Sequence, residues 1–412
     1  MTSAPLHLFD AYGVELEYMI VAQDTLAVRP IADQLIQAAH GTVVNEIERG
    51  EICWSNELVA HVIELKTNGP APTLDGLADR FLENIQAINA YLQPFHARLM
   101  PTAMHPWMDP HTETRLWPYD YNIIYETYHR IFDCRGHGWS NLQSIHINLP
   151  FADDTEFNRL HAAIRLVLPL LPALAASSPV VGSACTGSLD NRMVFYRNNS
   201  VRIPSVAGVV VPETVSSQRE YVEKILQPMY EEIAPYDPDG VLQDEWLNSR
   251  GAIARFDRQA IEIRVLDIQE NPYADLAIVA LVVAVVKHLT EERWADLDAM
   301  KAYPLPELES VFLATIAQAE HAVLADPTYL RLFGYAGKSC TAGELWKALM
   351  VSCHDCLPTQ PRIQAFYSLY QEQGSLAQRI LKRLQPAFTH AAIETLYREL
   401  CDCLHDGVHF RA

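Results

Sequence analysis

The sequence predicts an α+β fold in which a largely antiparallel sheet is flanked by helices. Four segments place acidic residues or a histidine among the apolar residues of expected strands: 13–18, 57–64, 144–149 and 260–265. Strand and helix patterns mix without the regular strand–helix–strand alternation of a parallel sheet. From Pro272 onward the pattern is almost wholly helical.

The elements expected in the first third of the chain alternate between strand and helix. They are a strand at 8–22, a helix near 30–40, strand material at 42–67, a helix from Thr73 to about His96 and a strand near 97–104. Thr73 is the expected N-terminal cap, because it follows the breaker Asn68-Gly69-Pro70-Ala71-Pro72. Residues 108–135 are rich in Tyr, His, Asp and Pro, so we expect a long functional loop there.

That loop carries one helical piece, and the elements expected after it complete the sheet and add helices. They are helix 121–132, strand 141–149, an apolar helix at 154–176, an irregular stretch at 180–211, helix 212–234, strand pairs around 241–268, and helices to the end. We expect a catalytic core at 1–290 and a helical C-terminal region at 291–412 packed on it. The apolar run 276–286 is about half the ~20 residues that cross a bilayer, which favours a buried helix.

Composition limits the classes of partner. The net charge of the 412 residues is -20, which argues against non-specific nucleic-acid binding and fits a soluble protein. The N-terminus lacks the basic and apolar regions of a secretory signal, so we expect a cytoplasmic protein with reduced thiols and no membrane partner.

A zinc site could be imagined from Cys353, Cys356, Cys401 and Cys403. Their segments read as helical, however, and in a helix cysteine is a small apolar residue. A homo-oligomer is compatible with the sequence.

The candidate chemistry lies in side chains that share strand faces. Residues two apart on a strand point the same way, so Glu15 pairs with Glu17, and Glu262 pairs with Arg264. Ser144, His146 and Asn148 also share a face. If these strands form one sheet, its polar face suits divalent metals and phosphates. The alternative for any single strand is a face exposed to water.

Two carboxylates on one strand face, ~7 Å apart, repel each other, and burying them unpaired is costly unless a cation neutralises them. Magnesium does so and keeps positions for phosphate oxygens. Glu57 and Glu64 are seven apart, so a regular strand would place them on opposite faces, and only a bulge or bend brings both inward. His146 could complete a metal site or simply be hydrogen-bonded.

Three arginines are candidate anion ligands. Arg264 could hold a transferring phosphoryl group or form a structural ion pair with Glu262. Arg192 and Arg197, in an irregular stretch, are anion clamps or solvent-exposed residues. The chain has no GxxxxGK[ST] and no GxGxxG after a strand, so metals and arginines would hold a nucleotide.

Six segments, in order, resemble the glutamate-cysteine ligase superfamily, especially its second family of bacterial carboxylate-amine ligases. They are GVELEY, NELVAHVIELKTNGP, MHPW, SIHINLP, ALAASSPVVGSACTGSLDNRMVFYR and IEIRVLDIQENP, spread over most of residues 10–290. The departures from the family pattern are Glu57 in place of Asp, Ser144 in place of the first His of H-V-H, and Met104 in place of Thr.

The resemblance implies the fold shared by glutamine synthetase and guanidino kinases, with an antiparallel sheet forming a metal-lined funnel. It also implies two or three Mg²⁺ or Mn²⁺ ions held by Glu15, Glu17, Glu57, Glu64, His146 and Glu262. Arg264 would contact ATP phosphates, with Arg197 and His146 also at the cofactor. Arg192 or Arg197 would hold the substrate carboxylate or the transferring phosphoryl group.

The reaction implied is ATP-dependent amide formation. The side-chain carboxylate of glutamate would attack ATP to give an acyl phosphate, and an amine such as that of cysteine would displace phosphate. A general base is expected from an Asp, Glu or Tyr of the 108–135 loop. The alternatives are a guanidino-type ATP phosphotransferase and a non-catalytic relative that binds metal or nucleotide. Retention of all six presumed ligands counts against the latter.

Overall fold

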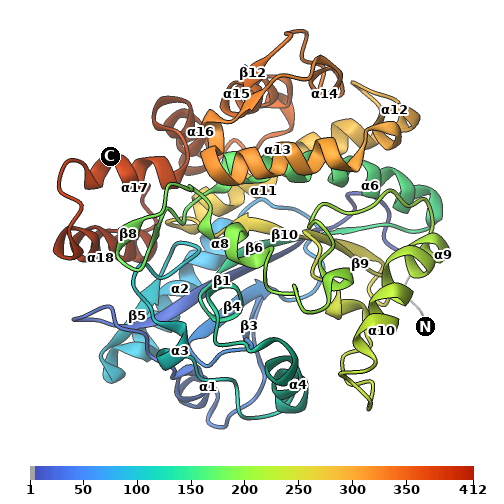
Figure 1. Cartoon of the computed structure of the whole chain (residues 1–412). Coiled ribbons are helices and arrows are strands. Elements are labelled where there is room, and N and C mark those ends of the chain that lie inside the picture. Colours follow the sequence, from blue (N-terminus) through green and yellow to red (C-terminus); the bar gives the residue numbers. More distant parts are fainter. Residues whose placement is uncertain (1–4) are drawn as a thin grey trace.

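The structure is a computed structural model that describes residues 5–412, and its centre is an eight-stranded sheet with antiparallel pairings (Figure 1). The strand order is β2-β3-β4-β1-β6-β10-β9, and β5 pairs with the second half of β1. The strands are Gly13–Ala22 (β1), Glu46–Arg49 (β2), Ile52–Asn56 (β3), Val62–Thr67 (β4), Ala97–Met100 (β5), Ser144–Pro150 (β6), Ala252–Arg255 (β9) and Ala260–Asp267 (β10). The predicted mixture of helices with a largely antiparallel sheet is confirmed, while the metal-lined funnel stays a prediction.

One face of this sheet is apolar and carries the main core. Its buried side chains include Leu16, Leu65, Ile145, Ile147 and Ile263. Helices α2 (Leu77–Leu92) and α6 (Asp154–Val167) contact strands of the sheet, and α11 (Pro272–Thr290) packs against both helices. Each Leu or Ile side chain buried here contributes ~1.5–3 kcal/mol, so alternation of apolar and polar residues fixes which face of each strand points inward.

Helix α11 is the central helix of the core. It begins where the Asn271 side chain accepts hydrogen bonds from the backbone N–H groups of Tyr273 and Ala274, with Pro272 at the first helical position. Its length and composition are those of a helix that could cross a membrane, but 94% of its most apolar window is buried inside the protein. The prediction of a buried helix is confirmed.

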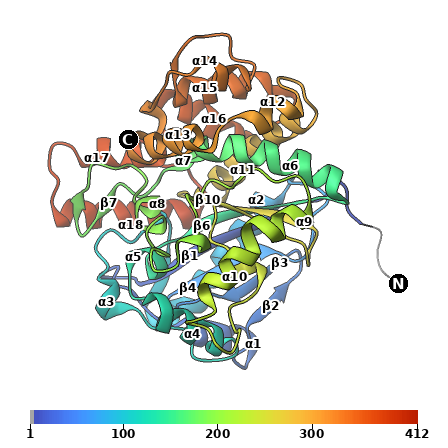
Figure 2. The ribbon, with the colours of Figure 1, turned by 45° about the vertical axis from the view of Figure 1, so that its right-hand side comes forward.

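The C-terminal part of the chain is helical, as predicted. Its helices are Leu297–Ala302 (α12), Leu305–Gln318 (α13), Pro327–Arg331 (α14), Ala342–Ser352 (α15), Pro361–Gln373 (α16), Leu376–Leu384 (α17) and His390–Asp406 (α18). The one departure is a short ladder between β11 (Val323–Leu324) and β12 (Cys340–Thr341). Helix α16 packs on α11, and α18 packs on β5 and α2. Figure 2 shows α12 to α16 stacked above α11, away from the sheet. The boundary at residue 290 stays a prediction.

Two long connections, at about 108–140 and 180–250, lie over the polar face of the sheet. Their helices are Pro110–Glu113 (α3), Asn122–Phe132 (α4), His137–Ser140 (α5), Asn191–Tyr196 (α8), Gln218–Tyr221 (α9) and Gln227–Ile233 (α10). A hairpin of Val180–Val181 (β7) with Ala184–Cys185 (β8) precedes α8, in a stretch expected to be irregular.

Helix α1 (Ala32–His40) lies where it was predicted, but two other helix starts differ from expectation. The Thr73 hydroxyl accepts a hydrogen bond from Asp75 N in a turn, and α2 begins four residues later, after Gly76 at φ 79°. Only glycine adopts this left-handed conformation freely, so the chain direction changes there. The helix expected from 212 begins at Gln218, because the Ser217 side chain caps it by accepting from Glu220 N.

Candidate active site

The strand register gathers the candidate site residues on the polar face. Glu15 on β1 lies opposite His146 on β6, and Glu17 lies opposite Glu64 on β4. Glu262 on β10 pairs with the residue two positions along β6 from His146. These are four neighbouring strands, so side chains that are far apart in sequence become cross-strand neighbours.

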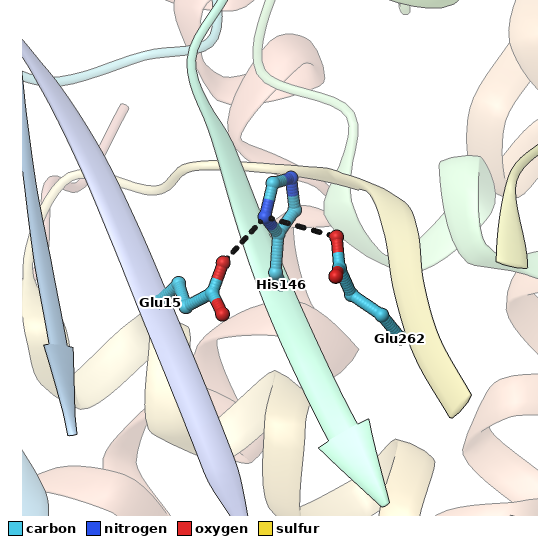
Figure 3. A group of neighbouring side chains, drawn as sticks. All are labelled: Glu15, His146 and Glu262. Atoms are coloured by element: carbon cyan, nitrogen blue, oxygen red, sulfur yellow. Dashed lines mark hydrogen bonds and ion pairs between the residues drawn. The ribbon is translucent and has the colours of Figure 1, made fainter. Parts of the chain in front are cut away.

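The first group of potential metal ligands is Glu15, His146 and Glu262, shown in Figure 3. His146 Nδ1 lies 2.9 Å from Glu15 Oε2 and 3.7 Å from Glu262 Oε1. The three side chains come from three adjacent strands and point toward one another. One ligand atom from each lies within 4.8 Å of the others, which is close enough to share one cation.

The second group is Glu17, Glu64 and His146, so His146 belongs to both groups. Glu17 Oε2 accepts hydrogen bonds from Ser144 N at 2.7 Å and from Ser144 Oγ at 2.8 Å. Ser55 Oγ donates to Glu64 Oε1 at 2.7 Å. These bonds hold each carboxylate in one orientation while its other oxygen remains available.

Glu57 joins the same site because the strand breaks after Asn56. Strand β3 ends there and β4 begins at Val62, so Glu57 lies at the start of the connection. Both Glu57 and Glu64 line the same cavity. The seven-residue spacing that a single strand could not accommodate is therefore split between the end of one strand and the middle of the next.

The protonation of two of these carboxylates reflects crowding. Burial raises the pKa of Glu64, and the charge of Glu15 raises it further, to about 7. Burial and the charges of Glu64 and Glu17 likewise raise the pKa of Glu57 well above its ordinary value. Ionised carboxylates this close together need a positive charge to balance them. A bound cation supplies that charge, so cation binding here is favourable.

His146 and Glu15 behave in the opposite way, because they form a charge-assisted hydrogen bond. Burial opposes the charged form of each, but their mutual hydrogen bond and nearby charges outweigh it. The pKa of His146 is raised to about 9, and that of Glu15 is lowered to about 2. The imidazolium is therefore a positive charge at the meeting point of the carboxylates.

A cavity of about 520 Å³ lies over this face. Cationic residues on its wall are Lys66, Arg192, Arg255, Arg258 and Arg264. Aromatic residues on its wall are Tyr121, Tyr125, Tyr128, Trp139, Tyr196 and Trp246. The Tyr128 ring lies 5.3 Å from that of Trp139 and 5.9 Å from that of Trp246. The cavity thus combines acidic, cationic and aromatic surfaces.

A second cavity, of about 350 Å³, shares Glu46, Lys66 and Arg258 with the first. Gly13 and Gly69 are among the residues of its wall. A Cβ at Gly13 would lie 2.8 Å from Asn148 Cβ, so glycine permits the close approach by which Asn148 Nδ2 donates to Glu15 Oε1 at 3.0 Å. The two cavities meet beside the carboxylate groups.

Comparison with known proteins identifies the family. A family model described as glutamate-cysteine ligase family 2 matches residues 11–399 of the chain. The chain belongs to glutamate-cysteine ligase family 2. An uncharacterized protein of Archaeoglobus fulgidus is 31% identical over 395 residues, which cover 95% of this chain and 98% of that protein. The resemblance seen in the six motifs is thereby confirmed.

Two solved ligases share the fold of this family member. The glutamate–cysteine ligase of Francisella tularensis, in complex with AMP, has a TM-score of 0.64 at 13% identity, covering 96% of this chain and 88% of that one. A bifunctional glutathione synthetase from Pasteurella multocida has a TM-score of 0.57 at 14% identity, covering 97% and 53%. The family and the shared fold support a carboxylate–amine ligase.

The family member's three candidate arginines lie in different environments. Arg264 lines the large cavity, with Nε 2.7 Å from Glu262 Oε1. Arg192 also lines it, but its side chain is 1% exposed and its Nε donates to Asp267 Oδ1 at 2.6 Å. Arg197 lies outside the wall of either cavity, 4.0 Å from Glu309 of α13. The structure therefore brings Arg264 and Arg192 to the site and leaves Arg197 apart.

Sequence reasoning missed Lys66, Arg255 and Arg258 on the cavity wall. Lys66 carried a usable signal, because it follows Glu64 by two positions on the same strand and so shares its face. Arg255 and Arg258 carried none, since they reach the site through the pairing of β9 with β10 and the turn between them.

The 108–135 loop contributes tyrosines to the cavity and no Asp or Glu. Burial and the charge of Glu57 raise the pKa of Tyr125, so its hydroxyl stays protonated at neutral pH.

The cysteines do not gather into a zinc site. Cys353 Sγ lies 3.6 Å from His288 Nδ1, and Cys401 packs in a separate apolar cluster. Among residues 5–412, the groups of potential metal ligands contain no cysteine.

Proposed function

We propose that this protein is an ATP-dependent carboxylate–amine ligase that activates the side-chain carboxylate of glutamate and joins it to an amine such as that of cysteine. The observation that carries the proposal is the meeting of two acidic groups at His146, which with Glu17 and Glu64 lines a cavity whose wall also carries cationic side chains. Acidic ligands and cationic side chains together suit a nucleoside triphosphate bound with metal ions.

Mg²⁺ or Mn²⁺ fits the residues present. The proposed ligands are Glu15, Glu17, Glu57, Glu64, His146 and Glu262, and all but one offer carboxylate oxygens. Lys66, a cation beside these ligands, already lies 2.7 Å from Glu46 and 3.3 Å from Glu64. When bound, such ions neutralise phosphate oxygens and the charge that develops as the phosphoryl group transfers.

The chain's own residues would bind and orient the reactants. Arg264, with Arg255 and Arg258 nearby on the wall, provides fixed positive charge for phosphates. A glutamate carboxylate oxygen attacks the γ-phosphorus and ADP leaves. The amine nitrogen then attacks the acyl carbon, the C–O bond to phosphate breaks, and the nitrogen loses a proton. No side chain need form a covalent bond.

The aromatic wall has a role in the second step. The Tyr128 and Trp246 rings lie 5.9 Å apart on one wall of the cavity, and their apolar surface would exclude water beside it. An acyl phosphate is readily hydrolysed, so a dry wall protects it until the amine arrives. The proposal assigns this protection to the α4 side of the cavity.

A phosphate-release screen tests the proposal. The protein is given ATP and Mg²⁺ with single amino acids, single amines and pairs, beginning with glutamate and cysteine, and both ADP and phosphate are measured. A ligase forms both only when acid and amine are present. A guanidino-type kinase forms ADP without phosphate, and a non-catalytic relative forms neither, so either result would overturn the proposal.

Glu15→Gln and Glu262→Gln should each abolish Mg²⁺-dependent ATP turnover while leaving the fold intact, because each removes a charge from the group around His146. Glu48→Gln is the matched control, since Glu48 is exposed on β2. Circular dichroism checks the fold of each variant. Wild-type turnover in either site variant would show that the metal ligands are wrongly assigned.

A further inference from the structure

Strand β10 has a bulge directly beside the acidic groups. Arg264 and Val265 together stand opposite the single residue His146, between two regular pairings of β10 with β6. A bulge interrupts the alternation of side chains and re-aims the residues at it. Arg264 lines the cavity while Val265 is fully buried in the core. The direction of the Arg264 side chain therefore depends on how the bulge is held.

Arg192, on α8, contacts the bulge at the Arg264 carbonyl and the strand just beyond the bulge at Asp267. Its Nε donates to Asp267 Oδ1 at 2.6 Å, and its Nη1 and Nη2 lie 3.3 and 3.2 Å from the Arg264 carbonyl oxygen. Asp267 Oδ2 in turn accepts from Ser177 N and Ser178 Oγ, both at 2.9 Å. The planar guanidinium spans a carboxylate and a carbonyl three residues apart, which a single ammonium group does not do.

These contacts occupy the guanidinium N–H groups that Arg192 would need in order to bind an anion. All three nitrogens of the Arg192 guanidinium have protein acceptors, and the side chain of its partner Asp267 is 0% exposed. The positive charge of Arg192 is therefore largely committed to Asp267. Arg264, by contrast, is more exposed, with 25% of its side chain accessible.

We infer that Arg192 is a positioning residue: it fixes the Arg264 carbonyl at the β10 bulge and so aims the Arg264 guanidinium at Glu262 and the cavity. This inference rests on the proposed function, in which Arg264 provides positive charge for the phosphates. It differs from the sequence-based expectation that Arg192 itself holds an anion.

Arg192→Lys tests this inference, because lysine keeps the charge beside Asp267 and loses the fork to the Arg264 carbonyl. We expect kcat for ATP-dependent phosphate release to fall by up to about 100-fold, as misplacing a reacting group by ~1 Å can do. The KM values for acid and amine should change less than about twofold, because a positioning residue does not itself bind either substrate. A raised KM for the acid with unchanged kcat would overturn the inference and return Arg192 to the role of substrate clamp.

Arg379→Lys is a matched control. Arg379 is also buried, with Nη1 2.6 Å from both Glu270 Oε1 and the Phe410 carbonyl oxygen, and it lines neither cavity. Both lysine variants should lower the melting temperature. Only Arg192→Lys should lower kcat. An equal loss of kcat in both would show that Arg192 acts through general stability alone.

Coupling to Arg264 separates this inference from the proposed function. In an Arg264→Lys background, adding Arg192→Lys should change kcat less than twofold, since the residue it positions is already altered. Multiplicative effects would overturn the inference. Wild-type turnover in Arg264→Lys alone, or no turnover in the wild type, would instead contradict the proposed function.

Amide hydrogen exchange tests the positioning role even without turnover. The Arg264 N–H donates to the Gly251 carbonyl oxygen at 2.8 Å, so its exchange reports on the bulge. Arg192→Lys should speed exchange in peptides covering 260–268, and Arg379→Lys should leave those peptides unchanged. Unchanged exchange in Arg192→Lys would overturn the inference.

Discussion

His146 is the residue on which the two acidic groups converge. Its imidazole contacts Glu15 and Ser144 through different ring nitrogens, 2.9 Å away in each case. Because its pKa is raised to about 9, it carries a proton at neutral pH and partly balances the carboxylates. A metal ion that binds there must displace this proton, and also that of Glu64, whose pKa is about 7.

The affinity for a metal ion should therefore rise with pH, because protons and the metal ion compete for the same side chains. Glu64 holds a proton below about pH 7 and His146 below about pH 9, so the apparent affinity for Mn²⁺ should rise from pH 6 to pH 8, by up to about tenfold per unit for each group that is still protonated. Glu64→Gln should weaken Mn²⁺ binding and reduce this slope, while Glu48→Gln should change neither. Titration calorimetry at several pH values measures both. An unchanged slope in Glu64→Gln would contradict the assignment.

At the scale of elements, a buried ion pair fastens α17 and the C-terminal segment to the loop after β10. Arg379 of α17 contacts Glu270 and the Phe410 carbonyl oxygen, each at 2.6 Å. Burial opposes the charge on Glu270, but Arg379 and His409 outweigh it and lower the pKa of Glu270 to about 2. The helix, the loop and the chain end are thus fixed by one charged group.

Acid should weaken this junction. The pKa of Glu270 is about 2 in the folded protein and ordinarily 4.5, so its stabilisation is fully present above about pH 4.5 and is lost as pH falls toward 2. In Glu270→Gln the free energy of unfolding should fall less steeply as the pH is lowered from about 4.5 to 2. Arg379→Met should cost about 3–5 kcal/mol, because it leaves a buried carboxylate unpaired. Urea unfolding from pH 2 to 7 measures both, and a Glu270→Gln curve parallel to the wild type would refute the linkage.

At the scale of the whole molecule, the C-terminal helices and the sheet share one core. Phe366 and Tyr370 of α16 belong to the same apolar cluster as Leu16 of β1 and Val282 of α11. A second cluster joins β1 and β5 to α17 and α18. The helices after α11 thus complete the apolar cover of the sheet.

A chain ended at residue 290 should fail to fold as a soluble monomer. It would expose the α16-facing side of α11 and the side of β5 that α18 covers, which belong to two separate apolar clusters. Soluble yield and near-ultraviolet circular dichroism measure the outcome, with the full chain as control. A soluble fragment with a cooperative melt would show that residues 5–290 fold independently.

Several strands and their faces could be predicted because period-2 alternation is a local property. Glu15 and Glu17 share a face whatever their neighbours, and Leu16 between them points to the opposite face, where it is buried. The buried helix at 272–290 was predictable from its composition. The Thr73 cap was wrong because the left-handed Gly76 lies between it and the helix. Local signals thus predict elements better than their exact ends.

By itself, the sequence determined which side chains lie on the polar strand faces and, through six ordered motifs, the family to which the chain belongs. Only the tertiary structure decided how they meet. Strand register sets Glu15 against His146, the break after Asn56 admits Glu57, and the β10 bulge brings Asp267 to Arg192 while Arg197 is left beside Glu309. The physical reason is that side-chain direction follows from local backbone geometry, whereas distance between strands depends on pairings made far along the chain.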